Sequence, residues 1–165
     1  MKVPSLNIRL AISYIQDSPI GKSLYDFALS KGYKFANNGS YPEAGWLDTP
    51  NKTIWLPGAN SPQNIAGAIA HEAMHIDAGV DSLLQEYCSY AVGSAVENEV
   101  VQAGHGSFDM ITLDKFTVNV YNYQSRDQLA TDLTNWFIAQ GLGYYVEKGY
   151  PALPLMPLPY LPGFN

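Results

Sequence analysis

The chain has 165 residues, of which 47% are hydrophobic, and this is enough for one folded domain with an apolar core. Its formal net charge is −6 at pH 7, whereas nucleic-acid-binding proteins usually have an excess of basic residues, so we expect no nucleic-acid partner. The sequence contains neither a signal-peptide pattern nor an apolar run that could span a bilayer, so we expect no membrane partner. Cys88 is the only cysteine, which excludes an intrachain disulfide and favours a cytoplasmic location.

The first elements expected from the N-terminus are a helix and three strands. Ser18 can cap a helix over residues 18–31, because proline follows it at the first helical position and glycine follows the end. Residues 33–36 are typical of a short strand. Residues 45–48 and 53–57 are strand-like runs on either side of a Pro-Asn turn, which predicts a β-hairpin.

Three longer helices are expected in the rest of the domain. A second Ser-Pro pair predicts a helix over residues 61–78, and Asp81 or the serine after it can cap another that runs to about residue 102. Residues 111–123 are rich in β-branched and aromatic side chains and predict one or two strands. The last helix is expected over residues 125–148, where two glycines can bend it.

The pattern HExxH stands at residues 71–75, inside the predicted 61–78 helix. Residues four apart lie on one face of a helix, so His71 and His75 can present ring nitrogens to one metal ion. Glu72 follows the first histidine and can act as a general base on metal-bound water. A catalytic zinc usually takes a third protein ligand, which must come from elsewhere in the chain.

Glu86 is the preferred third ligand. It lies early in the predicted 81–102 helix, and Gly79 allows the chain to turn so that this helix folds back on the histidine pair. Glu86 shares one face with Tyr90 and Glu97, a polar stripe on an otherwise apolar helix. A polar stripe that faces inward needs a partner, and a metal ion would supply one.

Two other residues compete for the same role. Asp81 falls six residues after His75, the spacing of the third ligand in the metzincins, but the glycine of that pattern would stand where Ala78 is. His105 lies between two glycines in a predicted loop and could reach a metal, or act as a hydrogen-bond donor near it. On the residues alone these alternatives stay open.

The HExxH helix, the hairpin before it and the glutamate helix after it are similar to the zincin metallopeptidases, in a minimal gluzincin-like form. Residues 44–100 carry this resemblance. It implies a small zincin-like α+β domain, in which a short mixed sheet or hairpin packs on the motif helix and a long helix follows. It also implies Zn²⁺ bound by His71, His75 and Glu86, with Glu72 as the general base in hydrolysis of peptide or protein substrates.

The resemblance implies two further features of the site. Tyr87, Tyr90 and His105 are the candidates for the side chain that stabilises the oxyanion, and the strand at residues 53–56 is expected at the sheet edge that holds the substrate. The alternative function is a metal-binding zincin scaffold without turnover that acts through protein–protein contacts.

The C-terminal segment differs in composition from the domain at residues 1–150. Residues 151–165 contain five prolines among leucines and aromatic residues, which excludes a helix and is too apolar for a solvated linker. We expect this tail to pack on the domain, to dock in the cleft as a self-inhibitor, or to bind a partner.

Overall fold

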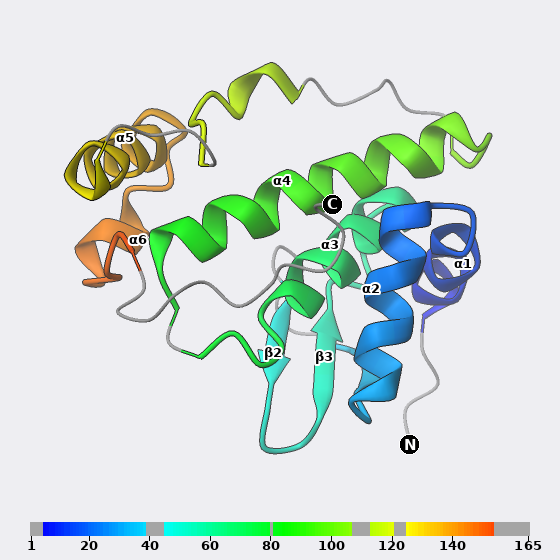
Figure 1. The fold of residues 1–165 in the computed structure, drawn as a ribbon. Helices are drawn as coiled ribbons and strands as arrows, with labels where there is room; N and C mark the ends of the chain where they lie inside the picture. Colours follow the sequence, from blue (N-terminus) through cyan, green and yellow to red (C-terminus); the bar gives the residue numbers. More distant parts are fainter. Residues whose placement is uncertain (1–4, 39–44, 80, 107–112, 121–124, 154–165) are drawn as a thin grey trace.

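The computed structural model describes residues 5–38, 45–79, 81–106, 113–120 and 125–153. They form an α+β domain in which helices surround a small sheet, as the sequence predicts (Figure 1). The α-helices are α1 (Leu6–Ile15), α2 (Pro19–Ser30), α3 (Pro62–Met74), α4 (Leu83–Gln102), α5 (Arg126–Ala139) and α6 (Tyr144–Glu147). The strands are β1 (Lys34–Asn37), β2 (Trp46–Asp48) and β3 (Thr53–Leu56), and residues Leu113–Lys115 form a 3-10 turn.

The five longer helices begin in the same way, with a serine whose hydroxyl accepts a hydrogen bond from the backbone N–H three residues later. This satisfies one of the N–H groups that have no partner within the helix. The caps of α2 to α5 confirm starts that the sequence indicates. Helix α1 was not predicted; it begins at Ser5 and buries Ile8, Ala11 and Ile15.

The three strands form one mixed sheet in the order β1-β3-β2. The predicted hairpin is confirmed, because β2 pairs antiparallel with β3, and Lys52 makes the turn with a φ of 49°. Strand β1 pairs parallel with β3 on its other side. The expectation that β3 lies at a sheet edge is therefore wrong: β3 is central, and β2 holds an edge.

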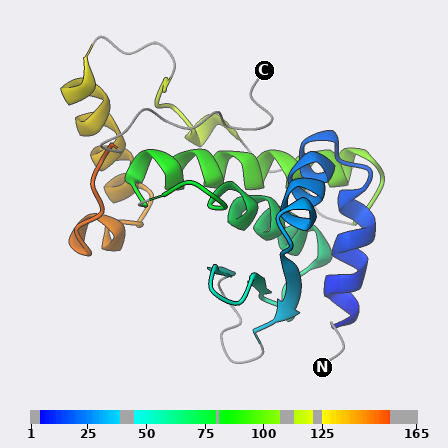
Figure 2. The same cartoon turned by 60° about the horizontal axis from the view of Figure 1, so that its bottom comes forward.

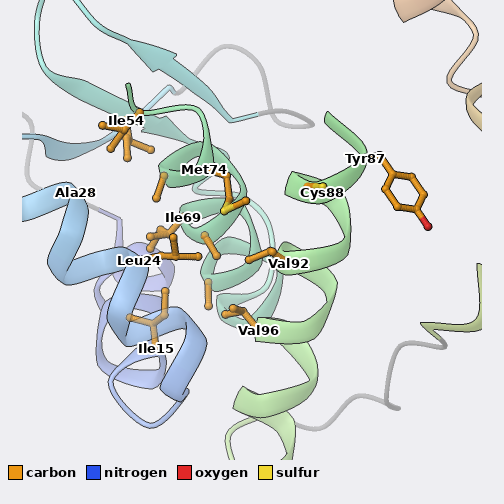
Figure 3. Packing of buried hydrophobic residues seen from close by; sticks show 14 of the residues in the cluster. Ile15, Leu24, Ala28, Ile54, Ile69, Met74, Tyr87, Cys88, Val92 and Val96 are labelled. Atoms are coloured by element: carbon orange, nitrogen blue, oxygen red, sulfur yellow. The ribbon is translucent and has the colours of Figure 1, made fainter. Parts of the chain in front are cut away.

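Helix α3 is the centre of the domain. It contacts α1, α2, α4 and the strands β2 and β3, and α4 crosses over it in both views (Figures 1 and 2). Ile69 on α3 is fully buried between Leu24 of α2, Ile54 of β3 and Val92 of α4 (Figure 3). This packing fixes the motif helix from several sides, so its polar face has a defined position.

The C-terminal third differs from its predicted form. The helix expected over residues 125–148 is two helices, because the chain turns at Gly141, whose φ of 73° glycine adopts without strain. Residues 116–120 form no strand, and the other positions of that predicted strand region, apart from the 3-10 turn, lie outside the described residues.

The start of the proline-rich segment packs on the domain. The backbone N–H groups of Leu83 and Leu84 donate to the carbonyls of Pro151 (2.9 Å) and Ala152 (3.1 Å), which gives the first turn of α4 partners that it lacks internally. Residues 154–165, where the expectations of self-inhibition and partner docking lie, are outside the described part of the chain. Among the described helices, none is long and apolar enough to cross a membrane.

Candidate metal centre

The two motif histidines lie at the C-terminal end of α3. The helix ends at Met74, earlier than residue 78, and His75 is its C-cap with a backbone that is still helical. His71 and His75 therefore keep the one-turn spacing, and their ring centroids are 5.2 Å apart. The chain then turns through Asp77 (φ 61°) and Gly79 (φ 77°) to start α4.

Glu86, in the first turn of α4, faces both histidines. Its Oε2 lies 3.4 Å from His71 Nε2, and its Oε1 lies 3.5 Å from His75 Nε2. One ligand atom from each of the three residues lies within 4.8 Å of the other two. The structure thus brings together the three residues that the sequence and the resemblance assigned to the metal.

Glu86 approaches each histidine through a different carboxylate oxygen, at a distance longer than a typical hydrogen bond. Zinc holds nitrogen and oxygen ligands at about 2.0–2.2 Å in a tetrahedron, which places neighbouring ligand atoms roughly 3.3–3.5 Å apart. A hydrogen bond would bring them to about 2.7–3.2 Å. Glu86 Oε2 and His75 Nδ1 are also buried without a hydrogen-bond partner among the described residues. Such atoms are costly to bury, and a bound cation would compensate Glu86 Oε2.

The charges of the three ligand residues are coupled. Burial lowers the pKa of His75, and the nearby Glu86 carboxylate only partly opposes this. Burial also acts against the charged form of His71, but its interactions with Glu86 and Glu72 outweigh it and raise the pKa of His71. Burial acts to raise the pKa of Glu86, yet the attraction of the two histidines holds it below its ordinary value. Glu86 therefore keeps its negative charge beside the two imidazoles, and such a carboxylate could also pair with a divalent cation.

Glu72 lies beside this cluster and is only 8% exposed. Burial raises its pKa to about 7, with the charges of Glu86 and Asp81 adding to the effect and that of His71 opposing it. Gly45, next to strand β2, lies beside its carboxylate: a Cβ at that position would be 3.4 Å from Glu72 Oε1, an ordinary contact distance. A carboxyl whose pKa is near neutrality can both accept and return a proton at physiological pH.

Two tyrosines form a wall of the site. Tyr90 packs edge-on against the His71 ring at 4.7 Å, and its hydroxyl is hydrogen-bonded to the hydroxyl of Tyr145 at 3.0 Å. Hydrogen bonding from Tyr145 also helps to lower the pKa of Glu86. The sequence pointed to Tyr90 but not to Tyr145, which lies on α6, 55 residues further along the chain. No local pattern marks Tyr145, because only the fold of the C-terminal helices brings it here.

The other sequence candidates lie elsewhere or play another part. Asp81 is half exposed, and its Oδ1 lies 3.7 Å from His75 Nδ1, the ring nitrogen that faces away from Glu86. Asp81 thus lies on the other side of the His75 ring, outside the group of His71, His75 and Glu86 that could hold a metal ion. Tyr87 is excluded as an oxyanion donor, because it points to the opposite side of α4 (Figure 3), where its hydroxyl bonds to the backbone of Val118.

His105 is not at the site either. It follows the far end of α4 from Glu86, and sixteen residues of that helix span about 24 Å. Its ring stacks on Tyr14 at 4.3 Å, and its Nε2 bonds to Asp17 at 2.6 Å. The expectation of a catalytic His105 is therefore corrected to a contact that ties the end of α4 to α1.

A cleft of about 270 Å³ opens beside the cluster. His71, Glu72, Tyr90 and Tyr145 line it at one end, and it continues along the groove between α3 and α4 to Glu97. The polar stripe of α4 therefore faces inward, as the sequence predicts. A ligand in the cleft can therefore contact the side chains of His71 and Glu72 directly.

Comparison with known proteins adds no relative to this picture: no family model, no curated protein and no solved structure matches the chain.

Proposed function

We propose that the protein is a zinc-dependent peptidase with a minimal zincin-like site. The observation that carries this proposal is the convergence of His71, His75 and Glu86 within 4.8 Å, next to the buried carboxyl of Glu72 and an open cleft. Two imidazoles and a carboxylate are a ligand set of catalytic zinc. A structural zinc site usually has four protein ligands, so three ligands beside a cleft favour catalysis.

The residues of the chain divide the work as follows. His71, His75 and Glu86 would hold the ion, and Asp81 would orient the His75 ring through its other nitrogen. When bound, zinc supplies Lewis-acid chemistry and lowers the pKa of water to near neutrality. Glu72 takes the proton of the attacking water and later transfers it to the leaving amine, as its position in the cleft and its near-neutral pKa allow.

The substrate carbonyl needs a donor for its developing negative charge. The hydroxyls of Tyr90 and Tyr145 are the nearest candidates, because both side chains line the cleft together with His71. Their two hydroxyl oxygens are hydrogen-bonded to each other at 3.0 Å. Burial raises the pKa of both, so each keeps its proton as a donor at neutral pH. The edge strand β2, which follows Gly45 of the cleft, can pair with an extended substrate.

Metal content is the first test. Protein purified without chelators should contain about one zinc per chain by elemental analysis, and Glu86→Ala should lose most of it. Glu147→Ala is the matched control: it removes an exposed carboxylate outside the ligand cluster, and it should keep the zinc. Equal zinc in Glu86→Ala and wild type, or no zinc in wild type after reloading, would contradict the proposed site.

Turnover is the second test. Glu72→Gln should keep the zinc but cleave a peptide mixture at least about a hundredfold more slowly than wild type, because it removes the general base. Zinc binding without cleavage of any peptide by wild-type protein would instead favour the non-catalytic scaffold.

A further inference from the structure

Glu97 is a carboxylate in the cleft that has no role in the proposed metal centre. It lies on α4, three helical turns beyond Glu86, and lines the same cleft as His71 and Glu72. Eleven residues of helix separate the two glutamates by about 16 Å, so Glu97 cannot share the ion that Glu86 binds. Its carboxyl therefore belongs to the part of the cleft away from the metal.

The packing of α3 against α4 holds Glu97 in this position. A Cβ at Gly67 would lie 2.6 Å from Glu97 Oε1 and 2.7 Å from its Cγ, so the side chain lies flat against the glycine on α3. Asn64, one turn earlier on α3, directs its amide nitrogen to the same oxygen at 3.5 Å. Gly67 and Asn64 thus form the surface on which the Glu97 carboxylate rests. A larger residue at position 67 would occupy the space of this carboxylate.

The negative charge of Glu97 is poorly compensated by the described residues. Burial raises its pKa to about 7, although the charge of Lys115 and the contact with Asn64 act to lower it. In the part of the chain that the structure describes, no lysine or arginine lines the cleft, and no cation lies within 4.0 Å of Glu97. The ammonium of Lys115 instead lies 5.3 Å from the centre of the Phe116 ring. A cation that entered the cleft would find a carboxylate to pair with.

The distance to the metal centre fixes where such a cation can belong in a substrate. Gly67 and Asn64 precede His71 by four and seven residues of α3, which is roughly 6–11 Å along the helix. An extended peptide advances about 3.3–3.6 Å per residue, so this span corresponds to about two to three residues.

We propose that Glu97 is a specificity-determining residue that binds a cationic group of the substrate within about three residues of the scissile bond. The group is either a lysine or arginine side chain or a free α-amino group, since each presents N–H donors and a positive charge to a carboxylate. This inference rests on the proposed peptidase function and names its substrate class.

Cleavage profiles test the substrate class. Wild type and Glu97→Gln are incubated with a broad peptide mixture in three forms: untreated, lysine-acetylated, and blocked only at the N-terminus. Wild-type sites should be enriched for a nearby cation, and in Glu97→Gln the ratio of cation-containing to neutral cleavage sites should fall at least about fivefold. The acetylated and blocked mixtures distinguish a side chain from an amino terminus. The same preference in both proteins would overturn the proposal.

A binding measurement decides the role of Glu97 without zinc or turnover. The carboxyl ¹³C signal of Glu97, identified by its loss in Glu97→Gln, is titrated with pH in zinc-free protein containing butylammonium chloride. The pKa of Glu97 should fall from about 7 when butylammonium is present. Tetramethylammonium chloride at equal concentration is the control for ionic strength, and the exposed Glu147 is the control residue. No fall beyond that with tetramethylammonium would refute the cation site. Absence of peptide cleavage in the first experiment would refute only the peptidase function.

Discussion

Replacing Gly93 by alanine should disturb both the fold and the metal centre. Gly93 of α4 lies against Gly67 of α3, and a Cβ there would be 2.9 Å from the Gly67 carbonyl oxygen and 3.6 Å from His71 Cβ. Backbone atoms cannot rotate away as a flexible side chain could. The two helices must therefore separate by roughly half an ångström to restore ordinary contact distances.

The effect on stability is the difference of two opposing contributions. Overpacking a tight interface costs about 1–3 kcal/mol, and alanine regains about 1 kcal/mol over glycine in a helix interior. The net loss is about 1 kcal/mol, which lowers Tm by roughly 3 °C for a domain of this size. The effect on zinc is larger, because ligand distances tolerate only about ±0.2 Å, and we expect affinity to fall at least about tenfold.

Thermal unfolding in chelator and competitive zinc titration measure these two effects. Gly143→Ala is the matched control, because the nearest atom to a Cβ at that position is Ile138 Cγ1 at 3.9 Å, an ordinary contact. It should leave zinc affinity unchanged. If Gly93→Ala keeps both the Tm and the zinc affinity of wild type, the close approach of α3 and α4 does not position the ligands, and the reasoning fails.

Three further predictions concern groups outside the ligand set. His105→Ala should keep the zinc content and cost about 1 kcal/mol or less in urea unfolding, because it removes a partly exposed hydrogen bond and a ring contact; loss of zinc in this variant would show that His105 does contribute to the metal centre. Burial raises the pKa of Glu97 from 4.5 to about 7, so the folded state binds this proton more tightly and loses stability as pH rises between these values. In chelator, Glu97→Gln should therefore gain more stability over wild type at pH 8 than at pH 5, and an equal gain would contradict this pKa. Burial also raises the pKa of Cys88 to about 11, so a thiol reagent at pH 8 should modify it only after unfolding, and rapid reaction of the folded protein would show it accessible.

Errors in the predicted elements came from interactions that a local pattern does not contain. The helix that begins at Ser5 has only three buried positions, and its apolar face is explained by contacts with α3. The continuous helix expected over residues 125–148 is interrupted at Gly141, where the return of the chain places Tyr145 against Tyr90. Strand β3 reads as a hairpin strand, but its parallel partner β1 makes it central.

Local sequence determined the half of the candidate site that could hold a metal ion. The four-residue spacing of His71 and His75 on a helix dictates that they share a face, and the serine caps determine where the main helices begin. The polar stripe of α4 indicated Glu86, because a buried carboxylate needs a partner.

Only the tertiary structure showed which of the candidate third ligands lies beside the histidine pair, and it alone identified the tyrosine pair. The turn after α3 directs Glu86 to the Nε2 atoms of both histidines, leaves Asp81 on the other nitrogen of His75, and sends His105 to the far end of α4. Helix periodicity specifies a face but not the neighbour that covers it. That neighbour depends on loop geometry and on contacts between segments far apart in the chain, such as the one that brings Tyr145 to Tyr90.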